Sequence, residues 1–84
     1  MSPEGKKYVP VRRTRNSIGK RIAALRNQKG MTQEDLAGAV AVKVGWDISR
    51  YTIKRIETGE REVTDIEIRR LATALGVNIQ ELFM

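Results

Sequence analysis

The chain has neither cysteine nor histidine among its 84 residues. Without thiols or imidazoles, disulfide bonds, zinc fingers and catalysis by cysteine or histidine are all excluded. No apolar run approaches the roughly 20 residues that a membrane-spanning helix requires, and residues 1–16 lack the apolar stretch of a signal peptide. With this length, these absences predict a single small domain in the cytoplasm.

Positive charge is concentrated in the first two thirds of the chain. The sequence holds 16 Lys and Arg against 10 Asp and Glu, for a formal net charge of +6. Residues 1–16 carry +4, residues 17–55 carry +5 and residues 56–84 carry −3. This polarity predicts an anionic partner for the basic part. A solvated surface with no partner is the alternative.

Residues 1–16 show neither helical nor strand periodicity. We expect them to form a flexible basic arm ahead of a domain that spans residues 17–84. Arg12, Arg13 and Arg15 are candidates for minor-groove contacts with DNA, where A·T tracts concentrate negative potential. A solvated tail that attracts anions without specificity explains these arginines equally well.

From residue 17 onward, capping residues, apolar periods and glycines together predict five helices. The predicted starts are Asn16 or Ser17, Thr32 with Asp35, Ser49, Thr64 with Glu67, and Asn78 with Glu81. The predicted ends are Gly30, Gly45, Gly59 and Gly76. The inward residues are Ile18, Ile22, Leu25, Leu36, Ala37, Val40, Val44, Ile53, Ile56, Ile68, Leu71, Ala72, Leu75, Ile79, Leu82 and Phe83. The fold class is therefore all-α, a compact five-helix bundle.

The sequence offers little for enzyme chemistry. Most acidic residues occupy capping or surface positions, and no glycine-rich phosphate loop follows a strand. Glu60 and Glu62 flank Arg61 in a predicted loop, where solvated charge is the ordinary interpretation. We expect no enzyme activity, no metal site, no cofactor and no small-molecule ligand.

Residues 32–57 have the layout of a helix-turn-helix, in which a tight turn separates two helices and the second is short and basic. On a wheel of about 100° per residue, the inward positions are Ile53, Ile56 and Glu57, and the outward ones are Tyr51, Lys54, Arg55 and Thr58. Arg50 lies in the first turn, where a long side chain reaches forward off the helix end. Arg and Lys donors suit a major groove; a solvated basic face is the alternative.

Several ordered segments carry a family resemblance. They are IGKRIAALR (18–26), KGMTQEDLA (29–37), IS (48–49), IKRIETG (53–59) and LATALGVNIQELF (71–83). Together they make residues 17–84 similar to the Cro/C1 (XRE-type) repressor DNA-binding domain, a lambda-repressor-like helix-turn-helix domain. No single segment is decisive, but the ordered set is highly specific.

The resemblance implies roles for individual side chains. Base-reading positions are matched by Arg50, Tyr51 and Arg55, with Thr52 and Lys54 as lesser candidates. Phosphate-contacting positions are matched by Thr32, Gln33, Ser49 and Arg61. The family also implies a partly buried structural ion pair between Arg26 and Glu57. Tyr51 is open to three roles: packing on a thymine methyl group, donating to a phosphate, or ordinary partly exposed packing.

The chain departs from the family pattern between the two helices of the motif. Ala37 and Ile53 are sixteen positions apart, about one and a half helical turns more than the usual spacing. The extra residues fall within 40–47. We expect a lengthened second helix or turn, with Trp46 folded back onto the core.

These observations predict a sequence-specific, double-stranded DNA-binding transcriptional regulator, a repressor. We expect a homodimer on a two-fold operator, because one short helix reads few base pairs. Leu82, Phe83 and Met84 are a candidate dimer surface, or they close the core.

Two other functions compete with this prediction. One is a protein-interaction module, such as an adaptor or an antitoxin-like partner, which exposed apolar surface on the fourth or fifth helix would favour. The other is nonspecific binding of RNA or a membrane surface through the arm alone, which deletion of residues 1–16 would reveal.

Overall fold

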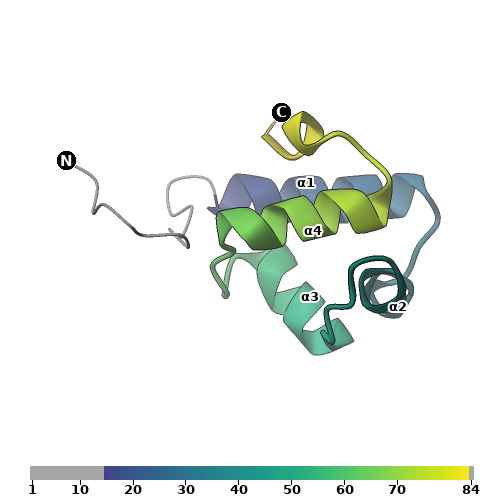
Figure 1. The fold of residues 1–84 in the computed structure, drawn as a ribbon. Coiled ribbons are helices and arrows are strands. Elements are labelled where there is room, and N and C mark those ends of the chain that lie inside the picture. Colours follow the sequence, from purple (N-terminus) through teal and green to yellow (C-terminus); the bar gives the residue numbers. More distant parts are fainter. Residues whose placement is uncertain (1–14, 84) are drawn as a thin grey trace, which may run out of the picture.

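The computed structural model describes residues 15–83, which form four α-helices and a short 3₁₀ helix. In chain order these are α1 (Arg15–Gln28), α2 (Gln33–Val44), α3 (Arg50–Thr58), α4 (Asp65–Leu75) and the 3₁₀ helix η2 (Ile79–Phe83) (Figure 1). The all-helical prediction is confirmed for these residues. The count of five helices is not, because the fifth element is a 3₁₀ helix.

Part of the sequence prediction falls outside the described residues. This applies to the proposed arm with Arg12 and Arg13, to the side chain of Arg15, and to Met84.

Three helices begin at their predicted caps. Thr32 accepts a hydrogen bond from the backbone N–H of Asp35 at 2.9 Å, and the Asp35 carboxylate accepts from the Thr32 N–H at 2.9 Å. Thr64 and Glu67 form the same reciprocal box at the start of α4. Ser49 caps α3 through the N–H of Thr52 at 3.2 Å. These side chains satisfy backbone donors that a helix start otherwise leaves unpaired.

The predicted start of α1 is wrong. The helix begins at Arg15, so Asn16 and Ser17 lie inside its first turn and do not cap it. Arginine is a good helix former. The first turn of α1, which carries the buried Ile18, therefore extends back to Arg15.

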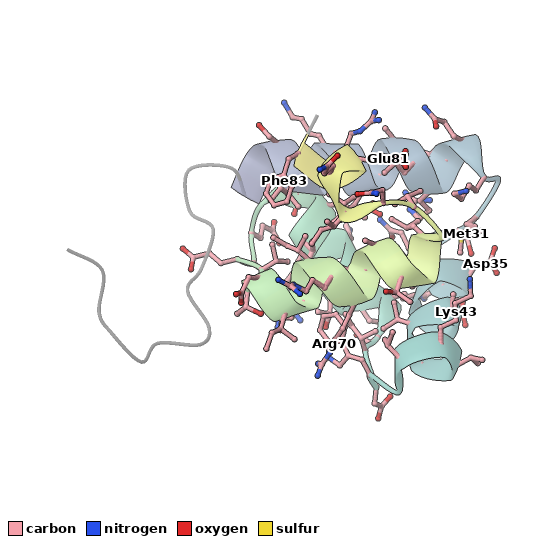
Figure 2. All side chains as sticks on the ribbon, turned by 45° about the horizontal axis from the view of Figure 1, so that its top comes forward. Met31, Asp35, Lys43, Arg70, Glu81 and Phe83 are labelled. Atoms are coloured by element: carbon pink, nitrogen blue, oxygen red, sulfur yellow. The ribbon has the colours of Figure 1, made fainter. Side chains whose placement is uncertain are left out.

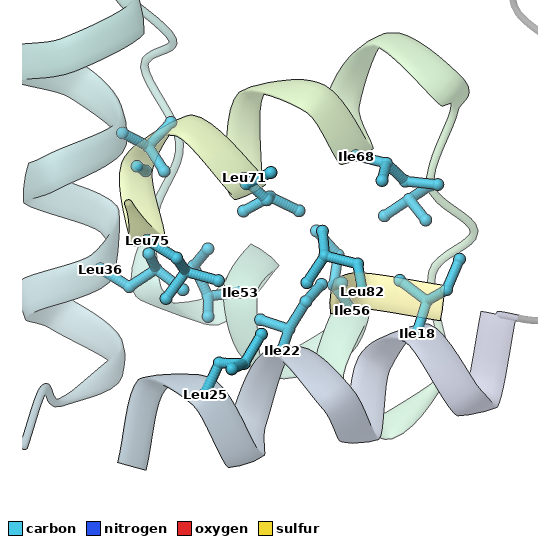
Figure 3. Close-up of a cluster of buried hydrophobic side chains, with 14 of the residues drawn as sticks. Ile18, Ile22, Leu25, Leu36, Ile53, Ile56, Ile68, Leu71, Leu75 and Leu82 are labelled. Atoms are coloured by element: carbon cyan, nitrogen blue, oxygen red, sulfur yellow. The ribbon is translucent and has the colours of Figure 1, made fainter. Parts of the chain in front are cut away.

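A single core joins all five elements. Ile18, Ile22 and Leu25 of α1 meet side chains of α3, α4 and η2 in the close-up of Figure 3. The fully buried members are Ile18, Ile22, Leu36, Val40, Ile53, Ile56, Val63, Ile68, Leu71, Leu75 and Leu82. Val44, Trp46 and Ile79 are half-buried and pack against this core.

Phe83 contradicts its predicted inward position, because 54% of its surface is exposed. A 3₁₀ helix has three residues per turn, so Ile79 and Leu82 share one side of η2 and Phe83 turns away from it. Arg21 of α1 holds this segment by donating its Nε–H to the backbone oxygen of Glu81 at 2.7 Å. Figure 2 shows Glu81 and Phe83 on η2, beside α1.

The extra residues within 40–47 lie in the last turns of α2 and in the connection after it. α2 runs to Val44 and ends at Gly45, whose φ of 68° is a left-handed conformation that suits glycine. The Lys43 ammonium donates to the backbone oxygen of Ala74 at 3.3 Å, and the Arg70 guanidinium lies 5.7 Å from the centre of the Trp46 ring. The lengthened segment is therefore attached to α4.

Candidate nucleic-acid interface

The outward face of α3 is polar and basic. Arg50, Tyr51, Lys54 and Arg55 are exposed along this nine-residue helix, while Ile53 and Ile56 are buried beneath it. The predicted inward and outward positions are therefore confirmed, and the side chain of Glu57 is only 6% exposed. Thr52 is half-buried. The helix is short, and its outer side presents three cations within six residues.

Arg50, predicted to reach forward off the helix end, contacts one side chain of α3 and one of α2. Its Nη2 donates to the Tyr51 hydroxyl at 3.1 Å, and its guanidinium carbon lies 5.0 Å from the centre of the Tyr51 ring. Its Nη1 lies 3.6 Å from Oε1 of Glu34, in the first turn of α2. The side chain thus turns toward α2. The hydrogen bond from Arg50, together with its charge, lowers the pKa of Tyr51.

A shallow open groove of about 610 Å³ lies beside this cluster, between α2 and the start of α3. The residues that line it are Glu34, Ala37, Gly38, Ala41, Ile48, Ser49, Arg50 and Tyr51. The α2 side chains there beyond Glu34 are all small, so the space in front of Arg50 stays open.

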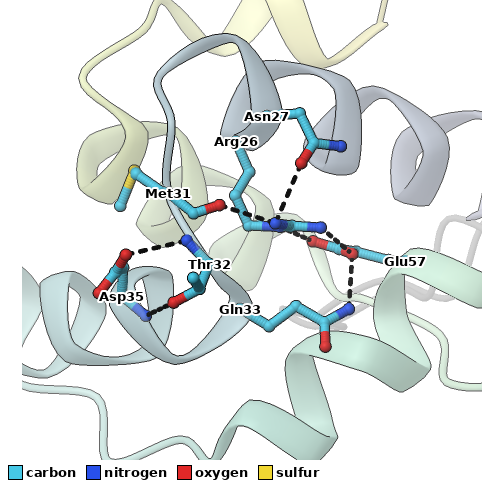
Figure 4. Close-up of polar contacts among 7 residues, drawn as sticks. All are labelled: Arg26, Asn27, Met31, Thr32, Gln33, Asp35 and Glu57. Atoms are coloured by element: carbon cyan, nitrogen blue, oxygen red, sulfur yellow. Dashed lines mark hydrogen bonds and ion pairs between the residues drawn. The ribbon is translucent and has the colours of Figure 1, made fainter.

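The start of α2 is tied to the end of α3. Gln33 donates its Nε2–H to Oε1 of Glu57 at 2.9 Å, and Glu57 also accepts hydrogen bonds from Arg26 (Figure 4). The Arg26 Nε and Nη2 bind the two oxygens of this carboxylate at 2.7 and 3.0 Å. Glu57 therefore joins α1, α2 and α3 through one carboxylate.

The pair that the resemblance implied, Arg26 and Glu57, lies in this network and is largely shielded from solvent. The two side chains are only 11% and 6% exposed. Arg26 also donates Nη1–H to the backbone oxygen of Met31 at 2.8 Å, which fixes the turn before α2 (Figure 4). The hydrogen bond to Glu57 raises the pKa of Arg26, against the effect of burial.

Arg61 is engaged within the protein. Its Nη1 and Nη2 donate to the two carboxylate oxygens of Glu67, each at 3.0 Å, and Nη1 also donates to the backbone oxygen of Glu62. Burial raises the pKa of Glu67, but the hydrogen bonds from Arg61 and the Thr64 backbone outweigh it and lower that pKa overall. Arg61 thus connects the loop after α3 to the start of α4.

Residues 15–83 contain no cluster of acidic side chains that would hold a metal ion. Within the same part of the chain, none of the helices is long and apolar enough to cross a membrane.

Comparison with known proteins agrees with this geometry. The family model described as helix-turn-helix matches residues 22–82. The chain belongs to the helix-turn-helix family. An HTH-type transcriptional regulator of Sinorhizobium fredii, y4dJ, is 38% identical to it over 68 residues, which cover 81% of this chain and 80% of that protein.

Solved helix-turn-helix proteins have the same fold. The restriction-modification controller protein C.AhdI of Aeromonas hydrophila is 34% identical with a TM-score of 0.68, over 84% of this chain and 94% of that one. The clp gene regulator ClgR of C. glutamicum is 25% identical with a TM-score of 0.72, over 82% of each chain. This helix-turn-helix chain is a DNA-binding transcriptional regulator, and its predicted family is confirmed.

Two residues that matter for how the helices meet could not be assigned a role from the sequence. Glu34 meets Arg50 across 16 positions of the chain, and no periodicity relates residues on separate helices. Gly19 lies buried where α1 crosses the end of α3. A glycine inside an otherwise helical pattern was the only available signal for it.

Proposed function

We propose that α3 enters the major groove of double-stranded DNA and reads base edges there. The observation that carries this proposal is the outward side of α3, where Arg50, Tyr51, Lys54 and Arg55 are exposed together. Arginine donates two hydrogen bonds to guanine, and lysine donates to guanine or to phosphate. Thr52, which is half-buried, is a lesser candidate for a base contact.

Phosphate contacts are proposed at the starts of α2 and α3. Helix N-termini attract anions through their free amides, and Thr32, Gln33 and Ser49 occupy these positions. Gln33 keeps one amide proton beyond its bond to Glu57. Arg61 is the weakest phosphate candidate, because Glu67 and Glu62 already take three of its donated hydrogen bonds.

We infer further that the protein acts as a homodimeric repressor in the cytoplasm. A helix of nine residues reads only a few base pairs, and two copies on a two-fold site double that number. Phe83, exposed on η2, is the candidate centre of the dimer surface, whereas Leu82 is 1% exposed and closes the core.

The alternative of a protein-interaction module required exposed apolar surface on the last two helical elements. Among the described residues, the large exposed hydrophobic side chains are Val42, Tyr51 and Phe83, and only Phe83 belongs to α4 or η2. One side chain of this kind suits a small dimer contact better than a broad docking face.

Selection from random duplex DNA, followed by variants on the selected site, tests the proposal. We expect Arg55→Ala to weaken binding by about 1–3 kcal/mol and to relax the preference at one base position. Gln33→Ala should weaken binding to all sequences similarly. Arg69→Ala, which removes an exposed arginine from α4, is the control for net charge and should leave the base preference intact. Failure to enrich any duplex at moderate salt would refute the proposal.

A further inference from the structure

A contact between Glu34 and Arg50 links the first turn of α2 to the base-reading side of α3. The atoms Oε1 and Nη1 are 3.6 Å apart, and the side chains are 77% and 53% exposed. The Tyr51 hydroxyl and ring hold the same guanidinium from its other side. Arg50 is therefore held by two side chains from two helices before DNA arrives.

Helix electrostatics explain why Arg50 requires this support. Arg50 is the first residue of α3, where the partial positive charge of the helix end disfavours a cation. Glu34 lies in the first turn of α2, where the same effect favours a carboxylate. The Glu34 carboxylate thus offsets the unfavourable position of the Arg50 guanidinium. Both residues line the groove that Gly38 and Ala41 keep open.

The contacts leave Arg50 able to bind a base. A guanidinium has five N–H donors. One on Nη2 is donated to the Tyr51 hydroxyl, whereas the 3.6 Å contact of Nη1 with Glu34 is an ion pair too long for a hydrogen bond. The other donors are enough for the paired hydrogen bonds to O6 and N7 of guanine. Glu34 and Tyr51 therefore need not release Arg50 when it reads a base.

We propose that Glu34 is a positioning residue that holds Arg50 for one guanine and keeps it from DNA phosphates. This inference rests on the proposed major-groove function of α3. Keeping the ion pair favours the cognate complex, because less side-chain freedom is lost on binding. A phosphate contact made by Arg50 while it stays paired would bring the Glu34 carboxylate toward the anionic backbone, which disfavours that contact. The pair therefore raises the ratio of specific to nonspecific affinity.

Glu34→Gln tests this role, because it removes the charge at nearly constant size on an exposed side chain. We expect its affinity for nonspecific duplex to rise about two- to fivefold, the range of an exposed ion pair. Affinity for the selected duplex should stay equal or fall, and the guanine preference at the Arg50 position should relax. The salt dependence of nonspecific binding should steepen by up to about one phosphate contact.

Glu60→Gln is the matched control, since it removes one exposed carboxylate from the loop after α3. In an Arg50→Ala background, the effect of Glu34→Gln should shrink to that of Glu60→Gln. The inference is overturned if Glu34→Gln strengthens both duplexes equally, or if its effect persists without Arg50. If the wild-type protein prefers no duplex, the proposed function fails together with the inference; the other two outcomes refute the role of Glu34 alone.

Discussion

At the scale of single residues, this protein depends on side chains that connect helices far apart in the chain. The Glu57 carboxylate accepts hydrogen bonds from Arg26 of α1 and from Gln33 of α2. Arg26 and Glu57 are almost fully shielded, so loss of either partner would leave a poorly compensated charge. The position of the α2 N-terminus relative to α3 follows from this network.

Gly19 also affects how two helices meet, because it has no side chain where α1 crosses α3. A Cβ at this position would overlap the backbone oxygen of Ile56 and lie 2.9 Å from that of Glu57. We expect Gly19→Ala to lower the free energy of unfolding by about 1–3 kcal/mol, because two helix backbones must separate. Urea titration monitored by circular dichroism would measure the change.

Gly38→Ala provides the opposite case within α2. A Cβ there meets nothing within 4 Å, so the better helix propensity of alanine should raise the free energy of unfolding by about 0.5–1 kcal/mol. If both variants changed stability in the same direction, close approach of α1 and α3 would not be the reason for Gly19.

At the scale of the elements, local sequence determines where most helices start and end. Thr32, Ser49 and Thr64 act as caps where the sequence placed them, and Gly45, Gly59 and Gly76 end helices in left-handed conformations. These features depend on residues within one turn of each other, which is why pattern alone predicts them. The last element differs from the predicted helix: η2 is a 3₁₀ helix that packs against α1 and α4.

The carboxylates at the starts of α2 and α4 predict that stability depends on pH. The pKa of Glu67 is lowered in the folded protein, as is that of Asp35, which the backbone hydrogen bond from Thr32 holds down. Carboxylates with lowered pKa values stabilise the fold above their unfolded pKa values, near 4, and this stabilisation is lost as the pH falls through the folded values. We expect the free energy of unfolding to fall from about pH 5 toward pH 3.

Glu67→Gln should flatten this fall and lower stability at pH 7 by about 1 kcal/mol, the typical worth of a helix cap. Chemical denaturation at a series of pH values is the measurement. Glu60→Gln serves as the control, and an equal flattening in both variants would argue against a special role for the Arg61–Glu67 pair.

At the scale of the whole molecule, the charge of +6 is unevenly distributed. The outward side of α3 carries cations, whereas residues 56–84 carry a net −3. The pairs Arg26–Glu57 and Arg61–Glu67 neutralise two arginines inside the protein. The cations of α3 at Lys54 and Arg55 remain exposed, and this asymmetry favours one orientation toward DNA.

The proposed dimer makes a prediction at this scale. Phe83→Glu should shift the protein toward monomer in analytical ultracentrifugation and weaken binding to a two-half-site operator, with little change in melting temperature. Leu82→Ala should instead lower the free energy of unfolding by about 2–4 kcal/mol, because it empties a buried site. A Phe83→Glu variant that still dimerises would place the dimer surface elsewhere.

The sequence alone determined the helical fold class, the family, most helix ends and the outward face of α3, because caps, glycines and apolar periods act over a few residues. It also marked the residues proposed to meet DNA. Only the tertiary structure decided which charges are free, since ion pairs depend on where separate helices meet. In the folded protein Arg50 contacts Glu34 and Arg61 binds Glu67. α1 passes so close to the end of α3 that a Cβ on Gly19 would overlap the backbone of α3. No local pattern carries that information, because these contacts form only when the helices pack.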